Sequence, residues 1–348
     1  MNCFNFAGNM FKHKLSQAVL ILLLTLTVGN VATCFAGSPE YVIKFSTLAP
    51  EGSAWMQEMR ALSADIEQAT DGNVSFKFYP GGVSGDEIDV IRKVRVGQIH
   101  AAGFTGVGLG EILPEVRVLD LPFLFDTDAQ IQHVYEKMNP YFSAEFEKNG
   151  YVLLGWVPVG WVYFFSKEEI DDVADLEKTK PWMWEGDPLV REAYQAFGIN
   201  PVPLSVTDVL LSLQTGMVDT VYASSQGALA LQWFTKVNYM TTLRMGYATG
   251  GVLLSKKKFD TLPDEYKRMV RDISARHLKK LMLKIQEDND KSIDIMQKNG
   301  VQLSRLPDEK EIGKFRQAGA IARSKLVGNL FSQELLDKVL SYMKEARP

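Results

Sequence analysis

Residues 41–66 read YVIKFSTLAPEGSAWMQEMRALSADI, and the hydrophobic period changes within this stretch. The first part, Tyr41–Thr47, is an apolar run that ends at a turn-forming segment, which predicts a buried strand. Beyond the turn, Trp55, Met59, Leu62 and Ile66 recur at helical spacing with polar residues between them. The stretch therefore predicts a strand followed by a helix, the repeating unit of an α/β fold.

The same alternation of strands and helices continues along the chain. We predict further strands at 74–78, 99–104, 151–156, 161–166 and 218–222, and helices at 86–96, 190–197 and 209–214. This order predicts an α/β protein with mostly parallel sheets.

A much longer helical pattern begins after Leu262-Pro263-Asp264 and continues to about Lys298. Proline and acidic residues are typical of a helix start. A helix of roughly 30 residues is about 45 Å long, which exceeds one lobe of ordinary size. We therefore expect this helix to cross two lobes.

The first residues are typical of an export signal. Lys12 and Lys14 precede an apolar run, residues 18–28, and Cys34-Phe35-Ala36 follows with the small residues of a cleavage site. We predict a signal peptide over residues 1–36, cleaved after Ala36, and a periplasmic location. A retained anchor, or lipidation of Cys34, are the alternatives.

Composition excludes several classes of function. The net charge of −4 and the absence of a basic tract argue against nucleic-acid binding. Both cysteines, Cys3 and Cys34, lie in or beside the predicted signal, so the mature chain would have no disulfide or thiol nucleophile. His100, His133 and His277 are far apart and form no metal or triad spacing. We predict a protein without cofactor or metal that is not an enzyme.

Several motifs occur together in a fixed order. They are Ser53-Ala54-Trp55, the segment 79–87 (YPGGVSGDE), Val96-Gly97-Gln98-Ile99, the segment 119–125 (LDLPFLF), the segment 212–219 (SLQTGMVD) and the segment 255–263 (SKKKFDTLP). Together they resemble the solute-binding proteins of TRAP transporters, the tripartite ATP-independent periplasmic carriers, of the dicarboxylate-receptor type.

The resemblance implies a Venus-flytrap receptor. Two α/β lobes, 37–159 with 248–287 and 160–247 with 288–348, would close on one small molecule, the second lobe carrying the C-terminal helices. A long helix would brace both lobes. The receptor, a monomer, would deliver its ligand to a large and a small TRAP membrane subunit. A periplasmic carrier that uses the same fold without a TRAP membrane unit is the alternative.

The chain departs from the family where the resemblance implies an arginine that holds a carboxylate. The usual Lys-x-Arg strand reads Lys180-Pro181-Trp182-Met183-Trp184, and the usual Gly-Phe-Arg run reads Gly160-Trp161-Val162. The family's Glu-Asn-Pro reads Tyr222-Ala223-Ser224. Aromatic residues cannot replace a bidentate arginine without a change of ligand chemistry. We expect a ligand that is apolar or aromatic in the part that relatives hold by a carboxylate.

The candidate ligand-binding residues are Trp55, Phe104, Thr105, Trp161, Trp182, Trp184, Glu185, Tyr222 and Ser225. Ordinary core packing is the alternative role for the paired tryptophans, and a solvated position the alternative for Glu185. Asp187 and Pro188 fit the start of the next helix. Arg191 is the nearby cation that could restore a carboxylate grip.

Four glycines, Gly103, Gly106, Gly108 and Gly110, follow a predicted strand but lack the G-x-G-x-x-G spacing of a dinucleotide site. We expect them to let the backbone approach a ligand or the opposite lobe. Asp120 and Asp219 belong to turns that the family resemblance implies, and no nucleophile with an adjacent base can be named for an enzyme.

Overall fold

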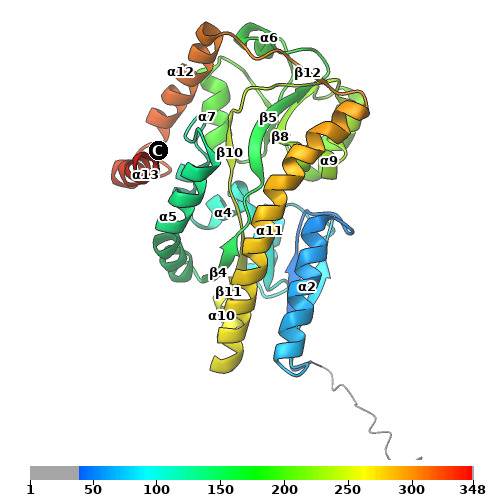
Figure 1. The fold of residues 1–348 in the computed structure, drawn as a ribbon, viewed down its shortest axis with the longest axis vertical. Coiled ribbons are helices and arrows are strands. Elements are labelled where there is room, and N and C mark those ends of the chain that lie inside the picture. Colours follow the sequence, from blue (N-terminus) through cyan, green and yellow to red (C-terminus); the bar gives the residue numbers. More distant parts are fainter. Residues whose placement is uncertain (1–38, 347–348) are drawn as a thin grey trace, which may run out of the picture. The chain divides into compact units, whose positions relative to one another are not determined.

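The computed structural model describes residues 39–346, so the predicted signal peptide and its cleavage site lie outside the described residues. Two five-stranded β-sheets and a small two-stranded sheet, with helices packed around them, form the described part of the chain (Figure 1). Over this part, no helix is both long and apolar enough for a membrane span.

The first sheet is mixed and has the strand order β2-β1-β3-β11-β4. Its strands are β1 (Tyr41–Ser46), β2 (Val74–Tyr79), β3 (Ala101–Thr105), β4 (Tyr151–Trp156) and β11 (Gly250–Ser255). Its helices are α2 (Ala54–Ala69), α3 (Glu87–Arg95), α4 (Gly106–Ile112), the 3-10 helix η1 (Pro114–Asp120), α5 (Asp128–Lys148) and α10 (Lys256–Phe259). We call this part the first lobe.

The second sheet has the order β10-β5-β9-β12, and β8 also pairs with β5. Its strands are β5 (Gly160–Ser166), β8 (Thr220–Ser224), β9 (Tyr239–Met240), β10 (Gly246–Ala248) and β12 (Gln302–Leu303). A small sheet of β6 (Trp182–Trp184) and β7 (Val202–Leu204) joins it through a bridge between Pro181 and Thr220. The helices of this second lobe are α6 (Val173–Glu177), α7 (Pro188–Ala196), η2 (Val206–Asp208), α8 (Val209–Thr215), α9 (Ser225–Ala230) and η3 (Trp233–Lys236).

Strand direction differs from the prediction of mostly parallel sheets. β11 runs antiparallel to both β3 and β4, and β5 runs antiparallel to β8, β9 and β10. β11 enters the first sheet directly from β10 of the second sheet, and its run Gly250–Ser255 is almost wholly buried. A strand buried on both faces carries no hydrophobic alternation that would reveal its direction.

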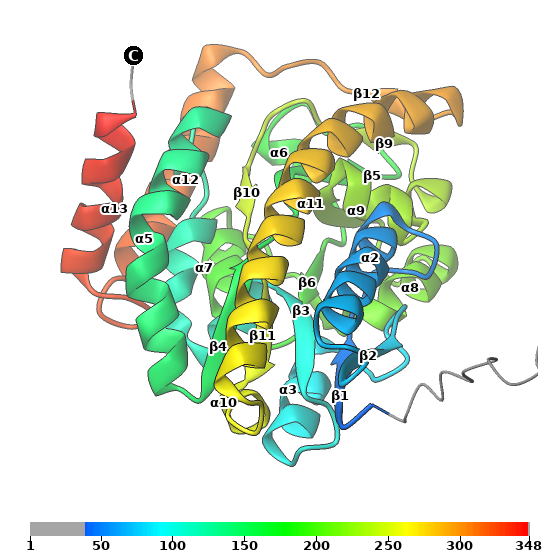
Figure 2. The same ribbon diagram turned by 60° about the horizontal axis from the view of Figure 1, so that its bottom comes forward.

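The long helix α11 (Asp264–Lys298) has 35 residues and crosses both lobes, as predicted. It packs on α2 and β4 of the first lobe and on α9 and β5 of the second (Figures 1 and 2). Leu278, Leu281 and Ile285 bury its apolar side in the core of the first lobe. The lobes are therefore joined by strand crossings and by one continuous helix.

Two helices complete the chain. α12 (Glu309–Leu326) packs on α7 of the second lobe, whereas α13 (Gln333–Glu345) packs on α5 of the first lobe. Leu335, Leu336 and Val339 join the same core as Phe142 of α5. The sequence analysis placed residues 288–348 in the second lobe, whereas α13 contacts α5 of the first lobe. The boundaries between the lobes stay a prediction.

Substitutions at two leucines of α11 test whether packing on the first lobe stabilises this helix. Leu281 is fully buried, whereas Leu283 on the same helix is 52% exposed. Leu281→Ala should lower the free energy of unfolding by about 2–5 kcal/mol, because it leaves a cavity between α11 and the sheet. Leu283→Ala should change it by no more than about 0.5 kcal/mol. Urea unfolding followed by circular dichroism measures both, and equal losses would contradict the assignment.

Candidate ligand cavity

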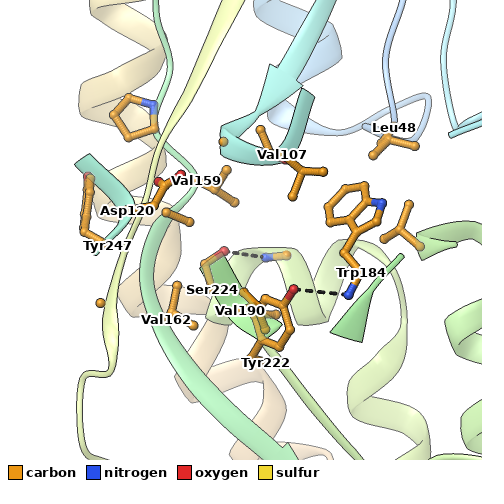
Figure 3. A pocket seen from close by; sticks show the side chains of 18 of the residues that line it. Leu48, Val107, Asp120, Val159, Val162, Trp184, Val190, Tyr222, Ser224 and Tyr247 are labelled. Carbon is orange, nitrogen blue, oxygen red and sulfur yellow. Dashed lines mark hydrogen bonds between the residues drawn. The ribbon is translucent and has the colours of Figure 1, made fainter. Parts of the chain in front are cut away.

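A cavity of about 330 Å³ lies between the two lobes and is lined by residues of both. Segments that follow β1 and β3 line it from the first lobe, and parts of β5, β6, β8, α7 and η3 line it from the second. Figure 3 shows Leu48 and Val107 on one side of this space and Trp184 and Tyr222 on the other. Its size suits one small organic molecule.

Aromatic rings form a continuous wall on the second-lobe side. Trp182 stacks on Tyr222 with ring centroids 4.8 Å apart, and it meets Trp233 edge-on at 5.2 Å. Trp184 lies 5.9 Å from Trp182. All four residues line the cavity. Because indole and phenol rings are large and rigid, this wall favours contact with an apolar or aromatic surface.

Strand alternation explains how Trp182 and Trp184 reach the same side. In β6 their side chains point to one face, and Met183 points to the other, where it packs with Tyr194. The polar tip of Trp182 is already occupied, since its Nε1 donates to the carbonyl of Leu204 at 3.0 Å. Trp182 is 1% exposed, so it serves both the core and the cavity wall.

Arg117 is the arginine that lines the cavity, and carboxylates hold it on both sides. Its Nε lies 2.8 Å from Asp120 Oδ2, and its Nη2 donates to Asp187 Oδ2 at 3.0 Å. Burial alone would lower the pKa of Arg117, but the charges of Asp187 and Asp120 outweigh it and raise the pKa. Asp120 itself has a raised pKa because burial outweighs the attraction of Arg117. Arg117 therefore carries its positive charge, and the carboxylates of Asp120 and Asp187 already balance that charge within the protein.

Glu87 is a third buried carboxyl group at the cavity, beside Asp120 and Asp187. It accepts hydrogen bonds from Thr105 N at 2.8 Å, from Thr105 Oγ1 at 3.0 Å and from Gly108 N at 2.7 Å. Burial raises the pKa of Glu87 to about 7, against the lowering effect of these hydrogen bonds. The group holds α3 to the start of α4 and titrates near neutral pH.

The structure brings six of the predicted site residues to the cavity: Trp55, Phe104, Thr105, Trp182, Trp184 and Tyr222. The hydroxyl of Thr105 is occupied within the protein, because it donates to Glu87 and accepts from Val107 N at the start of α4. Asp187 is the N-cap of α7 and Pro188 its first residue, as predicted.

Three predicted site residues do not line the cavity, and each has a physical reason. Trp161 follows the alternation of β5: Val162 faces the cavity, while the Trp161 indole turns away and donates to Asp128 at 2.9 Å. Glu185 is exposed in the turn before α7. Ser225 donates to the carbonyl of Asn289 at 2.7 Å, which ties α9 to α11.

Arg191, the alternative cation, is exposed on α7 and does not line the cavity. The sequence interpretation also missed lining residues, among them Arg117, Phe164, Leu189, Val190, Tyr194 and Trp233. Phe164 could have been found, because it lies two residues from Val162 on the same strand. Trp233 sits in a 3-10 helix whose short run carries no periodic signal.

The glycine-rich stretch makes room for side chains of its own lobe, and because Gly103 and Gly106 also line the cavity, the expected approach of this backbone to a ligand stays a prediction. A Cβ at Gly103 would lie 2.6 Å from the Trp55 ring, and one at Gly106 would overlap the carboxylate of Asp120. A Cβ at Gly108 would lie 2.6 Å from Glu87 Oε2. Glycine at these positions lets Trp55, Asp120 and Glu87 pack directly against the backbone.

Two α/β lobes, one long bracing helix and a shared cavity define a solute-binding protein of the Venus-flytrap class. The chain belongs to the bacterial extracellular solute-binding proteins, family 7, whose model matches residues 45–325. This finding confirms the family that the sequence motifs indicate, and the members of this family are binding receptors rather than enzymes.

Relatives and solved structures agree with this membership. The chain is 25% identical over 250 residues to the 2,3-diketo-L-gulonate-binding periplasmic protein YiaO of Escherichia coli, covering 70% of this chain and 75% of that protein. It is 25% identical over 318 residues to the ectoine/5-hydroxyectoine-binding protein UehA of Ruegeria pomeroyi, covering 87% and 92%.

Among solved structures, a TRAP periplasmic solute-binding protein from Desulfovibrio salexigens with bound orotic acid superposes with a TM-score of 0.82. The two sequences are 19% identical, and the match covers 88% of this chain and all of that one. A protein of the same kind from Xanthobacter autotrophicus with bound β-D-galacturonate gives a TM-score of 0.80 at 19% identity. Similarity at this level shows that the fold is shared.

The raised pKa of Glu87 gives a pH dependence with a definite sign. Between its ordinary value of 4.5 and the folded value of about 7, the folded state binds more protons than the unfolded state. The contribution of Glu87 to stability should therefore be fully present below about pH 4.5 and be lost as the pH rises to about 7, a loss of up to about 3 kcal/mol from this group.

Glu87→Gln, which mimics the protonated side chain, should remove this component of the pH dependence. Urea unfolding at pH 5 and pH 8 gives the change in the free energy of unfolding between these pH values for the parent and for the variant. The change in the parent minus the change in the variant is the component due to Glu87. A variant that loses as much stability as the parent over this range would show that Glu87 is already ionised in the folded protein at pH 5.

Proposed function

We propose that this protein is the periplasmic receptor of a TRAP transporter and that its ligand is a small, neutral molecule with a large apolar or aromatic part. The single observation that carries the ligand class is the aromatic wall of Trp182, Trp184, Tyr222 and Trp233 in a cavity whose arginine, Arg117, is already paired with carboxylates. Membership of the family and the TRAP receptors among its structural neighbours support the transport role.

Charge in the cavity disfavours an anionic ligand. One arginine is matched by Asp120 and Asp187, and Glu87 adds a third carboxyl group. Among residues 39–346, no lysine and no arginine other than Arg117 lines the cavity, so a ligand carboxylate would leave water without a free cation from this part of the chain to receive it. A Trp face that buries an apolar group instead contributes on the order of 1–3 kcal/mol.

The ligands of similar proteins differ from this expectation. Orotic acid and galacturonate, named for two structural neighbours, are both acids, whereas this chain has aromatic residues where the family resemblance implies a carboxylate grip. Delivery to a large and a small TRAP membrane subunit, by a monomer, completes the proposal. A carrier of the same ligand class without a TRAP partner is the alternative, and neighbouring genes for two such subunits would favour the receptor.

A ligand panel tests the proposed class. Neutral aromatic and aliphatic compounds should raise the melting temperature and change tryptophan fluorescence, because they would pack against the aromatic wall of the cavity. Succinate and galacturonate at the same concentrations should change neither. Native mass spectrometry of protein recovered from its own periplasm would identify a retained ligand directly.

A variant that fills the cavity serves as the control. Val107 lines the cavity and is only partly buried, so Val107→Trp should block binding while the protein stays folded. Leu283→Ala, far along an exposed face, should bind as the parent does. Tight binding of succinate that survives Val107→Trp would refute both the ligand class and the cavity.

The proposed export route predicts the mass of the mature protein. Material isolated from the periplasm should begin at Gly37, because we infer cleavage after Ala36. Intact-mass spectrometry distinguishes this product from the full chain and from a lipidated one. An added diacylglyceryl mass on Cys34 would contradict this prediction and would show that the receptor is anchored to the membrane by lipid.

A further inference from the structure

The carboxylate of Asp86 joins the two lobes beside the cavity. Asp86 is the N-cap of α3 in the first lobe and accepts from Glu87 N at 2.6 Å. Its other donors belong to the second lobe: Trp184 Nε1 at 3.0 Å, Ser205 Oγ at 2.7 Å and Val206 N at 3.2 Å. We call these four residues, Asp86, Trp184, Ser205 and Val206, the Asp86 bridge.

The donors of the second lobe supply most of the compensation for the charge of Asp86. This residue is 8% exposed, and no lysine or arginine in residues 39–346 forms an ion pair with it. A buried carboxylate without a cation needs several hydrogen bonds to be stable. When the lobes separate, three donors leave at once and only water can replace them.

A second buried polar contact between the lobes, the pair Arg117–Asp187, is less one-sided. Arg117 reaches Asp187 in the second lobe, but it keeps Asp120 of its own lobe as a partner. Separation would therefore leave Arg117 paired and Asp86 without its cross-lobe partners. The Asp86 bridge therefore depends more on the closed arrangement than the Arg117–Asp187 pair does.

Trp184 takes part in both the bridge and the ligand wall. Its ring lines the cavity, and its only polar atom in the side chain, Nε1, donates to Asp86. We propose that Asp86 is a positioning residue: it holds the Trp184 ring against the ligand and fastens the closed lobes, so that closure does not require a charge on the ligand. This inference rests on the proposed function in taking Trp184 as a contact of the ligand.

Two substitutions break the bridge from opposite ends. Asp86→Ala removes the acceptor, and Trp184→Phe removes the indole N–H while keeping an aromatic ring. Each should increase the dissociation rate of N-phenyl-1-naphthylamine, a neutral aromatic probe, roughly tenfold, as expected for a lost hydrogen bond to a charged group. The double variant should be little faster than either single variant, because both remove the same contact.

Trp182→Phe is the matched control. It also removes one indole N–H, but that group donates to Leu204 within the same small sheet. Its effect should add to that of Asp86→Ala instead of coinciding with it. A purely structural role for Asp86 as the cap of α3 would give additive effects with both tryptophans.

Small-angle scattering of the ligand-free proteins tests the fastening of the lobes without any probe. Asp86→Ala and Trp184→Phe should each have a larger radius of gyration than the parent and than Trp182→Phe. Equal radii together with additive dissociation rates would overturn the proposal. If the probe does not bind the parent, the proposed ligand class fails, and the radii alone decide: a larger radius in the two variants supports the bridge, and equal radii overturn it.

Discussion

Burial of the Arg117 guanidinium requires carboxylates close by, and the chain supplies Asp120 from the same 3-10 helix and Asp187 from the other lobe. Breaking such a buried pair by removing one partner typically costs about 3–5 kcal/mol. Because Asp187 also caps α7, the pairing fixes where that helix begins beside the cavity. The same pairing balances the positive charge that would otherwise bind an acidic ligand. The contact between the lobes and the chemistry of the ligand therefore depend on one set of ion pairs.

Local sequence patterns predicted the elements of the fold well. The strand at Tyr41, the helix that follows it and the long helix ending at Lys298 all carry clear periodicity, and they form within a few residues of the expected bounds. Strand direction and the docking of α13 on α5 depend on contacts between distant segments. Apolar residues such as Val339 indicate burial but do not indicate the partner, so these features could not be predicted from the pattern alone.

The candidate site was predictable where alternation or a motif pointed to it. Trp182 and Trp184 share a face because they are two residues apart in a strand, and both reach the cavity. The same rule places Val162 toward the cavity and Trp161 away from it. Whether a residue faces the cavity was therefore better predicted by its alternating position along the strand than by its being large and aromatic. The charge of Arg117 is balanced in part by Asp187, which lies 70 residues further along the chain. A contact between such distant residues cannot be predicted from the local sequence.

The two walls of the cavity differ in how freely they can change. On the first-lobe side, Gly103 and Gly106 leave no room for even a methyl group, because Trp55 and Asp120 fill the space above them. On the second-lobe side, the wall consists of side chains from a short strand and its neighbours, so a substitution there changes the surface that a ligand meets. The ligand range of such a receptor can therefore diverge through the side chains at positions 182 and 184, while the backbone on the glycine side stays the same.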